Sequence, residues 1–348
     1  MHILHALFSS RLAGSERYCV DLANRQVAAG HDVSVTGAPG SPLRNMLSRR
    51  VRYHPLGRFL RGPRLRGLIR TLRPDVCHGH LSGACRALAS LPPHHVTVAT
   101  LHVGYKPHQH ARLGGVICVN HAQTKRLEGY PGLARVIPNW MPAAEAPRTG
   151  SGLRETLGLA ANRFVVGAVG RLHPSKGMDI LITAFRSCAL DDARLVILGE
   201  GPQRRELEKL SAGDARIHLP GFRADVHSCL REIDLFVCPS REESFGLAII
   251  EAMGAQRPVI ATATEGPAEF MRDQPAVLVP PGSPAALADA IRTAYSQFQR
   301  GELAPANYDL TAFDPAPRID SIIGFYHQVA AARVPSTVEL AGKVSVTP

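Results

Sequence analysis

Short apolar runs that alternate with helical patterns dominate this sequence, and they constrain its fold more than any other feature. In the first half of the chain, apolar runs predict strands at 2–7, 32–36, 75–80, 96–101, 115–119 and 135–137. Between the first two runs, residues 15–29 predict a helix with Ser15 as its N-cap and Gly30 as its stop. Strands that alternate with helices favour a parallel, doubly wound α/β sheet.

The alternation stops at residues 138–152, which are rich in Pro, Gly and small side chains, and it then resumes. The second half predicts strands at 164–169, 194–198, 216–219, 234–238, 258–261 and 276–279. Helices are expected at 177–189, 202–211, 224–231, 245–255, 266–272 and 284–298. Because 348 residues exceed the roughly 250–300 at which one core stops growing, we predict two domains, 1–150 and 151–315. A helix at 316–332, expected to return to the first domain, and a loose tail at 335–348 follow.

Composition excludes several classes of protein. Apolar residues make up 45% of the chain and charged residues 20%, which is enough apolar surface to bury large cores. No apolar run approaches the ~18–20 residues of a membrane-spanning helix, and the start has no basic segment typical of a secretory signal. Seven scattered cysteines without a CxxC pair predict reduced, buried thiols and a cytoplasmic protein.

Charge is distributed unevenly along the chain. Residues 1–150 hold 20 Lys and Arg against 6 Asp and Glu, whereas residues 151–348 hold 20 against 23. The densest basic stretch, 44–73, contains ten arginines and no acid, and it includes apolar residues at helical spacing from Leu65 to Leu72. Two interpretations stay open: a helix that lies on an anionic membrane, or an ordinary helix with a solvated outer face. Nucleic acid is not expected, because no recognisable nucleic-acid module or interleaved aromatic residues accompany the charge.

The segment that follows the predicted strand 164–169 carries two basic side chains. Arg171 and Lys176 lie five residues apart in the loop 170–177. Ligands of open parallel sheets bind beyond the carboxyl ends of the strands. A guanidinium and an ammonium that converge there suit a diphosphate.

The segment after the strand 234–238 carries two acids. A helix is expected to start near Phe245, with its free N–H groups and positive dipole end available to a phosphate. Glu243 precedes this helix, and Glu251 lies within it among apolar neighbours. A carboxylate in such surroundings needs hydrogen-bond donors, which sugar or ribose hydroxyls supply. A simple cap for Glu243 and an internal salt bridge for Glu251 are the structural alternatives.

These segments resemble motifs of family 4 of the retaining glycosyltransferases, which have the GT-B architecture. Glu243 and Glu251 match the spacing of that family's E-x7-E motif, and Gly170-Arg171 with Lys176-Gly177 resembles its GR…KG loop. Further matches are Leu198–Pro202, Gly266–Glu269 and Val279–Gly282. Each piece is weak alone, but five in the right order over residues 2 to about 330 form a specific signal.

The resemblance implies a fold and a set of residue roles. It implies an α/β GT-B fold, in which two Rossmann-like domains face a central cleft. Arg171 and Lys176 would bind the diphosphate, Glu251 the ribose, and Glu243 with Ser244, Phe245, Gly246 and Leu247 the sugar. Gly14 and Ser15 correspond to the family's glycine-rich donor loop, although one glycine stands where two are common. His102 corresponds to an active-site histidine near the transferred sugar.

The expected function is retaining transfer of a sugar from a UDP- or GDP-sugar to a saccharide or lipid-linked acceptor, as in lipopolysaccharide synthesis. The basic first half favours an anionic acceptor and peripheral contact with the inner face of the cell membrane. No metal and no other cofactor are expected. The close pairs His78/His80, His94/His95 and His108/His110 lack zinc-site spacing and are expected at the rim or surface. The alternatives are a nucleotide-sugar epimerase or hydrolase on the same fold, and a basic membrane-surface binding protein without catalysis.

Overall fold

The computed structural model describes residues 1–9, 13–143 and 152–332. The chain forms two compact units. Unit 1 contains Met1–Cys118, Leu127–Ile137 and the chain from Ala316; unit 2 contains Val119–Arg126 and Pro138–Pro315. The main segment of unit 2 therefore starts at Pro138 and not at residue 151 as expected, and the unit also includes the short segment Val119–Arg126 from the first half. The expected tail, 335–348, lies outside the described residues.

Unit 1 is built on a parallel sheet, which has seven strands within the described residues. The strands are β1 His2–Ala6, β2 Asp32–Gly37, β3 Arg52–Pro55, β4 Val76–His80, β5 Thr97–Leu101, β6 Gly115–Cys118 and β7 Leu133–Val136. Their order is β3-β2-β1-β4-β5-β6-β7, so the direction of winding reverses between β1 and β4. Doubly wound sheets bind ligands at such a reversal, beyond the carboxyl ends of the strands.

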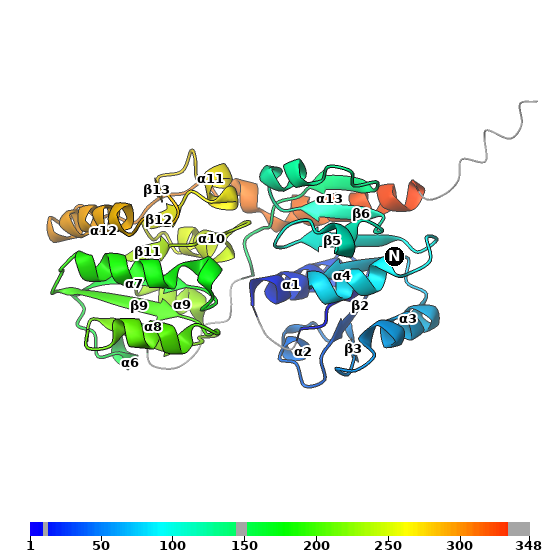
Figure 1. Ribbon diagram of the computed structural model, residues 1–348, viewed down its shortest axis with the longest axis horizontal. Helices are drawn as coiled ribbons and strands as arrows, with labels where there is room; N and C mark the ends of the chain where they lie inside the picture. The colour runs from blue at the N-terminus through cyan, green and yellow to red at the C-terminus, as the bar shows by residue number, and fades with distance from the viewer. Residues whose placement is uncertain (10–12, 144–151, 333–348) are drawn as a thin grey trace, which may run out of the picture. The chain divides into compact units, whose positions relative to one another are not determined.

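Helices cover both faces of this sheet (Figure 1). They are α1 Gly14–Ala28, α2 Leu43–Met46, α3 Arg61–Leu72, α4 Leu81–Ala89, α5 Pro107–His110 and α13 Pro315–Ala331. On one face, α3 and α4 pack on Leu4, Cys77 and Ala99. On the other face, α1 packs on Val33 and Val35, and α13 lies against Gly115 of β6, where an added Cβ would meet Val329 and Phe325.

Several local features of unit 1 differ from the sequence prediction. The edge strand β3 and the helices α2, α4 and α5 were not expected. Ser15 is not an N-cap, because α1 already begins at Gly14 and Ala13 occupies the N-cap position. There the Ala13 N–H donates to the buried carboxylate of Glu16, at 3.2 Å.

The apolar stripe of the arginine-rich stretch belongs to α3. Leu65 and Ile69 are buried in the core of unit 1, so the stripe packs against its own sheet and is not available to a membrane. The arginines on the outer side of α3, among them Arg64, Arg66 and Arg70, are exposed.

Unit 2 is built on a second parallel sheet, with six strands within the described residues. These strands are β8 Phe164–Val169, β9 Ala193–Leu198, β10 Ile217–Gly221, β11 Leu235–Cys238, β12 Val259–Thr262 and β13 Val277–Val279. The order β10-β9-β8-β11-β12-β13 reverses between β8 and β11. The two strands that carry the charged motifs are therefore neighbours at the point where ligands bind in this kind of sheet.

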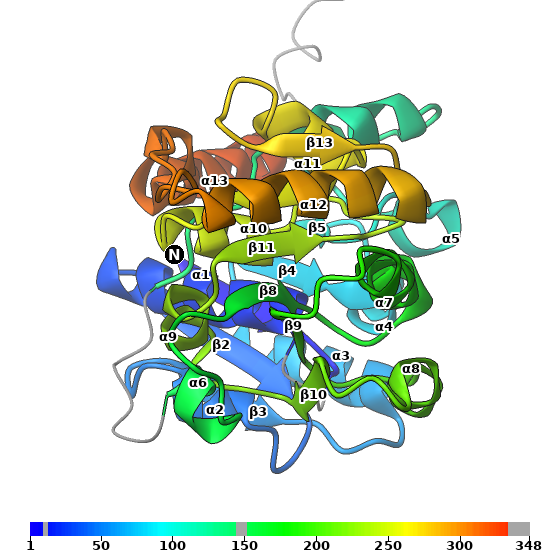
Figure 2. The same cartoon turned by 90° about the vertical axis from the view of Figure 1, so that its left-hand side faces the viewer.

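The helices of unit 2 form a layer on each face of its sheet (Figure 2). They are α6 Leu153–Thr156, α7 Met178–Ser187, α8 Arg204–Ser211, α9 Val226–Arg231, α10 Leu247–Gly254, α11 Glu265–Phe270 and α12 Pro284–Gln299. Phe164, Phe185 and Ile291 lie in the core under α7, α8 and α12. Val165, Phe236 and Ile250 lie in the core under α6, α9 and α10.

All seven cysteines are buried within the described residues and none forms a disulfide, as the sequence predicted. Among the same residues, no helix combines the length and apolar character that crossing a bilayer requires.

Candidate active site

Two loops of unit 2 lie side by side at the carboxyl end of its sheet. β8 and β11 pair in parallel register, with Val166 opposite Leu235 and Gly167 opposite Phe236. The loops that leave these strands, 170–177 and 239–246, are the two segments singled out in the sequence. The topology therefore brings both charged motifs to one edge of the sheet.

Hydrogen bonds hold the two loops together. The backbone N–H groups of Arg241 and Glu242 donate to the carbonyl of Ser175, at 2.8 and 3.1 Å. The Arg241 guanidinium donates to both carboxylate oxygens of Asp179, at 2.8 and 2.6 Å, and these hydrogen bonds lower the pKa of Asp179. Because the Arg241 guanidinium is paired with Asp179, we expect other cations to bind an anionic ligand.

A glycine allows the close approach of these loops. Gly177 has a φ of +63°, and a Cβ at this position would stand 2.1 Å from the carbonyl oxygen of Pro239. No side chain fits at that distance. In the Lys-Gly pair of the motif, the lysine supplies the charge and the glycine leaves room for the neighbouring loop.

Lys176 and Glu243 form an ion pair across the two loops. The side chains are 28% and 14% exposed, so the pair is shielded from solvent on most sides. Burial alone opposes the charge of Lys176, but the carboxylate of Glu243 outweighs it and raises the lysine's pKa. Lys176 is therefore a fixed cation at neutral pH. The sequence predicted both residues at the site but not their contact.

Arg171 differs from Lys176 in its surroundings. Its side chain is exposed, and within the described residues it takes part in no ion pair. The loop backbone around it is nevertheless anchored: the N–H groups of Gly170 and Leu172 donate to the carbonyls of Leu198 and Glu200, each at 3.0 Å. An anchored loop with an unpaired guanidinium is available to an anionic ligand.

The loop from Ser244 to Leu247 presents its backbone. Helix α10 begins at Leu247, two residues later than expected, because Gly246 has a φ of +97° and stands at the N-cap. The side chain of Phe245 is buried against Phe270 and Phe313. The ring of Phe245 therefore belongs to the core of unit 2, and only the backbone of this residue is available to a ligand. Glu251 lies one turn into α10 and is partly exposed.

Two further segments of unit 2 support this loop. The side-chain amide of Asn120 donates to the Ser244 carbonyl at 2.6 Å. Gly266, at the start of α11, donates its N–H to the Glu243 carbonyl at 3.1 Å. An added Cβ on Gly266 would stand 2.6 Å from the Ser244 oxygen, which explains the glycine of the Gly266–Glu269 motif.

The remaining predicted site residues lie in unit 1. Gly14 and Ser15 open α1, next to the winding reversal between β1 and β4. Residues 10–12 of the preceding loop lie outside the described residues. His102 follows the last residue of β5 and is partly exposed.

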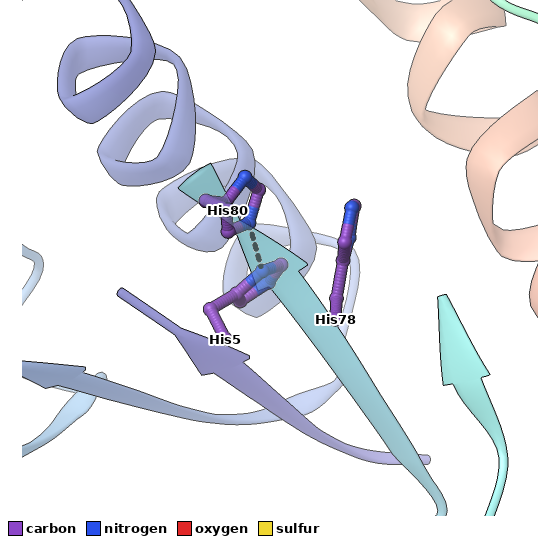
Figure 3. Close-up of side chains that lie close together, drawn as sticks. All are labelled: His5, His78 and His80. Carbon is purple, nitrogen blue, oxygen red and sulfur yellow. Dashed lines mark hydrogen bonds between the residues drawn. The ribbon is translucent and has the colours of Figure 1, made fainter. Parts of the chain in front are cut away.

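A cluster of buried histidines stands behind His102, and the sequence did not predict it. His78 and His80 are fully buried, not at the rim as expected, and they lie beside His5 of β1 (Figure 3). Potential ligand atoms of these three side chains all lie within 4.8 Å of one another. Of the other pairs, His94 and His108 are exposed and His110 is buried.

Hydrogen bonds explain why these polar rings are buried. His5 Nδ1 lies 3.0 Å from His80 Nε2, and His80 Nδ1 lies 3.2 Å from His102 Nε2. Burial lowers the pKa of His5 and of His102 to about 4, and it lowers those of His78 and His80 as well. The rings are therefore neutral at pH 7. His5 lies opposite His78 in the parallel register of β1 and β4. This proximity can be predicted from the sequence only once it is known that β1 and β4 are neighbours in the sheet.

Comparisons with known proteins agree with this geometry. The family description "Glycosyltransferase Family 4" matches residues 12–144, and "Glycosyl transferases group 1" matches residues 163–297. A lipopolysaccharide core biosynthesis glycosyltransferase, LpsD of Rhizobium meliloti, is 28% identical over 84% of this chain and 87% of its own length. A D-inositol 3-phosphate glycosyltransferase of Geodermatophilus obscurus is 32% identical over 74% of this chain and 67% of its own length.

Solved structures share the fold. The crystal structure of Anabaena Alr3699/HepE in complex with UDP and glucose has a TM-score of 0.80 and 24% identity, covering 94% of this chain and all of that one. WaaG, a glycosyltransferase involved in lipopolysaccharide biosynthesis, has a TM-score of 0.72 and 17% identity over 92% of this chain. With two doubly wound units, a basic loop and an acidic loop at one switch point, and these relatives, the chain belongs to glycosyltransferase family 4, the retaining enzymes of GT-B fold.

Proposed function

We propose that this enzyme transfers a sugar from a UDP- or GDP-sugar to an anionic saccharide or lipid-linked acceptor during lipopolysaccharide or other cell-surface polysaccharide synthesis. The observation that carries the proposal is Arg171, exposed and without an ion pair among the described residues, in the same loop as the fixed cation Lys176. The names of relatives that act in lipopolysaccharide core synthesis support the pathway. The buried thiols are consistent with a cytoplasmic enzyme.

In this proposal the donor is held mainly by unit 2. Arg171 and Lys176 bind the diphosphate, Glu251 accepts hydrogen bonds from the ribose, and Glu243 with the backbone of Ser244–Leu247 binds the sugar. Gly14 and Ser15, at the start of α1, add backbone contacts to the donor from unit 1. The two cations supply the positive charge that the leaving group requires, so no metal or other cofactor is invoked.

The transfer step forms a bond between the acceptor oxygen and the anomeric carbon and breaks the bond from that carbon to the phosphate oxygen. The acceptor attacks on the face from which the diphosphate leaves, and its proton passes to a phosphate oxygen, so the anomeric configuration is kept. Negative charge that develops on the leaving phosphate is stabilised by Arg171 and Lys176, whose loop backbone is anchored by hydrogen bonds to Leu198 and Glu200. No protein nucleophile is needed, unlike in the two-carboxylate scheme of retaining glycosidases.

Nucleotide binding tests the donor site. We expect UDP to raise the melting temperature by mass action, because a ligand at one hundred times its Kd stabilises a protein by about 2.7 kcal/mol. Thermal-shift assays with UDP, GDP and ADP would rank the bases. If none of the three raises the melting temperature at millimolar concentration, the catalytic reading gives way to a binding protein without catalysis.

Titration calorimetry with UDP tests the proposed role of Glu251. The change Glu251→Gln keeps the size of the side chain but removes its charge, so hydrogen bonds from the ribose weaken. We expect the Kd for UDP to rise about tenfold to a hundredfold in titration calorimetry, whereas Glu242→Gln, which changes an exposed acid in the loop before α10, should leave it unchanged. An unaltered Kd in Glu251→Gln would remove this residue from the ribose site.

A transferase is separated from an epimerase or hydrolase by incubating the nucleotide sugar without acceptor. We expect little consumption, because in the proposed step the acceptor oxygen completes the reaction. Rapid release of free sugar, or its conversion to an epimer, would favour the alternative enzymes.

Contact with an anionic membrane is the second part of the proposal. Phe59 and Leu60, just before α3, are 79% and 70% exposed. Arg58 and Arg64 beside them are exposed as well. Large apolar side chains bracketed by arginines match the interface of an anionic bilayer, where rings enter the headgroup region and guanidinium groups meet phosphates.

Vesicle sedimentation tests this contact. We expect wild-type protein to sediment with vesicles that contain anionic lipid at low salt, and Phe59→Ser with Leu60→Ser to abolish most of the binding. Phe222→Ser is the matched control, since Phe222 is 52% exposed but lies in the acidic half of the chain. Equal binding to neutral and anionic vesicles would dismiss the electrostatic contribution.

A further inference from the structure

We infer that a directional chain of hydrogen bonds through His80, His5 and Gln26 fixes His102 in one tautomer, with Nε2 protonated and Nδ1 left as an acceptor for a sugar hydroxyl. The last clause rests on the position beside the transferred sugar that the family resemblance implies for His102, which we adopt as part of the proposed function. His80, His5 and Gln26 are positioning residues in this inference, because they act on the sugar through His102.

The direction of the chain is set at its inner end. His5 Nε2 lies 2.6 Å from Oε1 of Gln26, and an amide oxygen only accepts hydrogen bonds. His5 therefore donates from Nε2. Since a neutral imidazole has one proton, Nδ1 of His5 must accept, and its partner at 3.0 Å, His80 Nε2, must donate.

The same reasoning carries outward to His102. With its proton on Nε2, His80 has only a lone pair on Nδ1. His102 Nε2, at 3.2 Å from that atom, must therefore be the donor. The remaining nitrogen of His102, Nδ1, carries a lone pair and makes no hydrogen bond within the described residues. It can accept a hydrogen bond from a hydroxyl but cannot donate one to a phosphate.

A second branch of the network agrees with this direction. The Gln26 amide nitrogen donates to the Tyr326 hydroxyl, at 3.3 Å. The hydroxyl in turn lies 2.6 Å from His78 Nδ1, a length typical of an O–H donor. His78 Nε2 then donates to Thr100 Oγ1 at 2.9 Å, the usual length of an N–H···O bond. With the Gln26 amide in this orientation, its oxygen toward His5 and its nitrogen toward Tyr326, every donor of the two branches meets an acceptor.

Neutral rings are a condition of the network. A second proton on His5 or His80 would place its Nδ1–H against the Nε2–H of the next histidine, His80 or His102, and would break the hydrogen bond between them. The lowered pKa values of His5 and His102, about 4 in both cases, keep the rings singly protonated at pH 7. Burial causes both shifts.

The network also accounts for the proximity of His5, His78 and His80 without a metal ion. Both ring nitrogens of each residue already have a hydrogen-bond partner: Gln26 and His80 for His5, Tyr326 and Thr100 for His78, and His5 and His102 for His80. A bound cation would need lone pairs that these bonds occupy. The cluster of possible ligands also contains no carboxylate to balance the charge.

The tautomers can be measured directly by long-range ¹H–¹⁵N correlation on full-length protein labelled at histidine, with peaks assigned by single His→Gln changes. We expect His5, His78, His80 and His102 to be neutral with the proton on Nε2. A proton on Nδ1 of His102, a mixture of tautomers, or a stabilising shift on addition of zinc chloride that is lost in His5→Gln would overturn the inference. This readout does not depend on activity.

The effect on catalysis is tested by two changes at His80. Asparagine can offer its Oδ1 near the position of Nδ1 and accept from His102, whereas leucine cannot. We expect His80→Leu to lower kcat about tenfold with the KM for the donor within about twofold, and His80→Asn to recover most of the loss. His78→Leu, which damages the same buried face but lies off the path from His102 to Gln26, should leave kcat within about threefold.

The outcomes separate the two levels of the claim. Equal loss of kcat in His80→Leu, His80→Asn and His78→Leu would show a merely structural role and overturn the inference. If His102→Ala keeps full activity while the tautomers are as expected, the proposed contact with the sugar is wrong but the network is right. Should His80→Leu fail to fold, the measurement on wild-type protein still decides the network.

Discussion

Replacing Arg171 with alanine is expected to lower kcat by about two to three orders of magnitude, as the loss of one charge-stabilising donor does in other enzymes. Stability should change by no more than about 0.5 kcal/mol, because the side chain is exposed and leaves no ion-pair partner behind within the described residues. Steady-state kinetics with a nucleotide sugar and thermal melts of the same preparation measure the two effects separately.

Two comparisons make the result specific. Arg205→Ala removes another exposed arginine of unit 2 and should leave turnover unchanged. Lys176→Ala should lower turnover as well, but it also leaves the mostly buried carboxylate of Glu243 without its cation, so it should lower stability too. Turnover near the wild-type value in Arg171→Ala would show that this residue does not bind the diphosphate.

The change Gly177→Ala is expected to abolish most donor binding by forcing the loops after β8 and β11 apart. The new Cβ would stand 2.1 Å from the Pro239 carbonyl oxygen, in a loop whose Arg241 and Glu242 N–H groups donate to the Ser175 carbonyl. One of the two loops must move, and the ion pair between Lys176 and Glu243 joins them. Calorimetric titration with UDP and a thermal melt would record the loss of binding and of stability.

Gly213→Ala is the matched control for this change. Gly213 has a φ of +79°, close to the +63° of Gly177, but nothing lies within 4 Å of an added Cβ. Both variants bear the cost of a left-handed alanine, about 1–2 kcal/mol, and only Gly177→Ala adds the clash. Equal stability and equal UDP affinity in the two variants would contradict the close contact of the loops.

The sequence predicted the elements that have strong apolar patterns. β8, expected at 164–169, is observed at Phe164–Val169, and its neighbour β9 starts one residue earlier than expected. β3 was missed because Arg52–Pro55 is a partly exposed edge strand, and such strands lack a continuous apolar run. The short α4 was missed in the same half.

The membership of residues 119–126 in unit 2 had no local signal. It follows from contacts that are far apart in the sequence: Asn120 with the Ser244 carbonyl, and His121 with Glu269, whose carboxylate accepts hydrogen bonds at 2.8 and 2.7 Å. Patterns within a window of ten or twenty residues do not contain this information.

In the candidate site, too, local motifs were predicted from the sequence, whereas contacts between distant residues were not. Motif spacing placed Arg171, Lys176 and Glu243 in the loops after two strands and Glu251 in the following helix, but the contact of Lys176 with Glu243 joins residues 67 positions apart. The histidines were misjudged because pairs close in sequence were considered alone. His5 meets His78 and His80 only through the register of β1 and β4, and buried rings are tolerated because each nitrogen is hydrogen-bonded.

The segment Val119–Arg126 has a practical consequence for anyone who recombines such enzymes. A cut at residue 137 would strip the second half of Asn120, His121 and Arg126, whose side chains bind Ser244, Glu269 and Glu265. A chimera that exchanges donor specificity should therefore transplant this octapeptide together with 138–315, even though the gene encodes it inside the other half. Hybrids joined at one crossover point would pair the loop 239–246 with a supporting segment from the other parent.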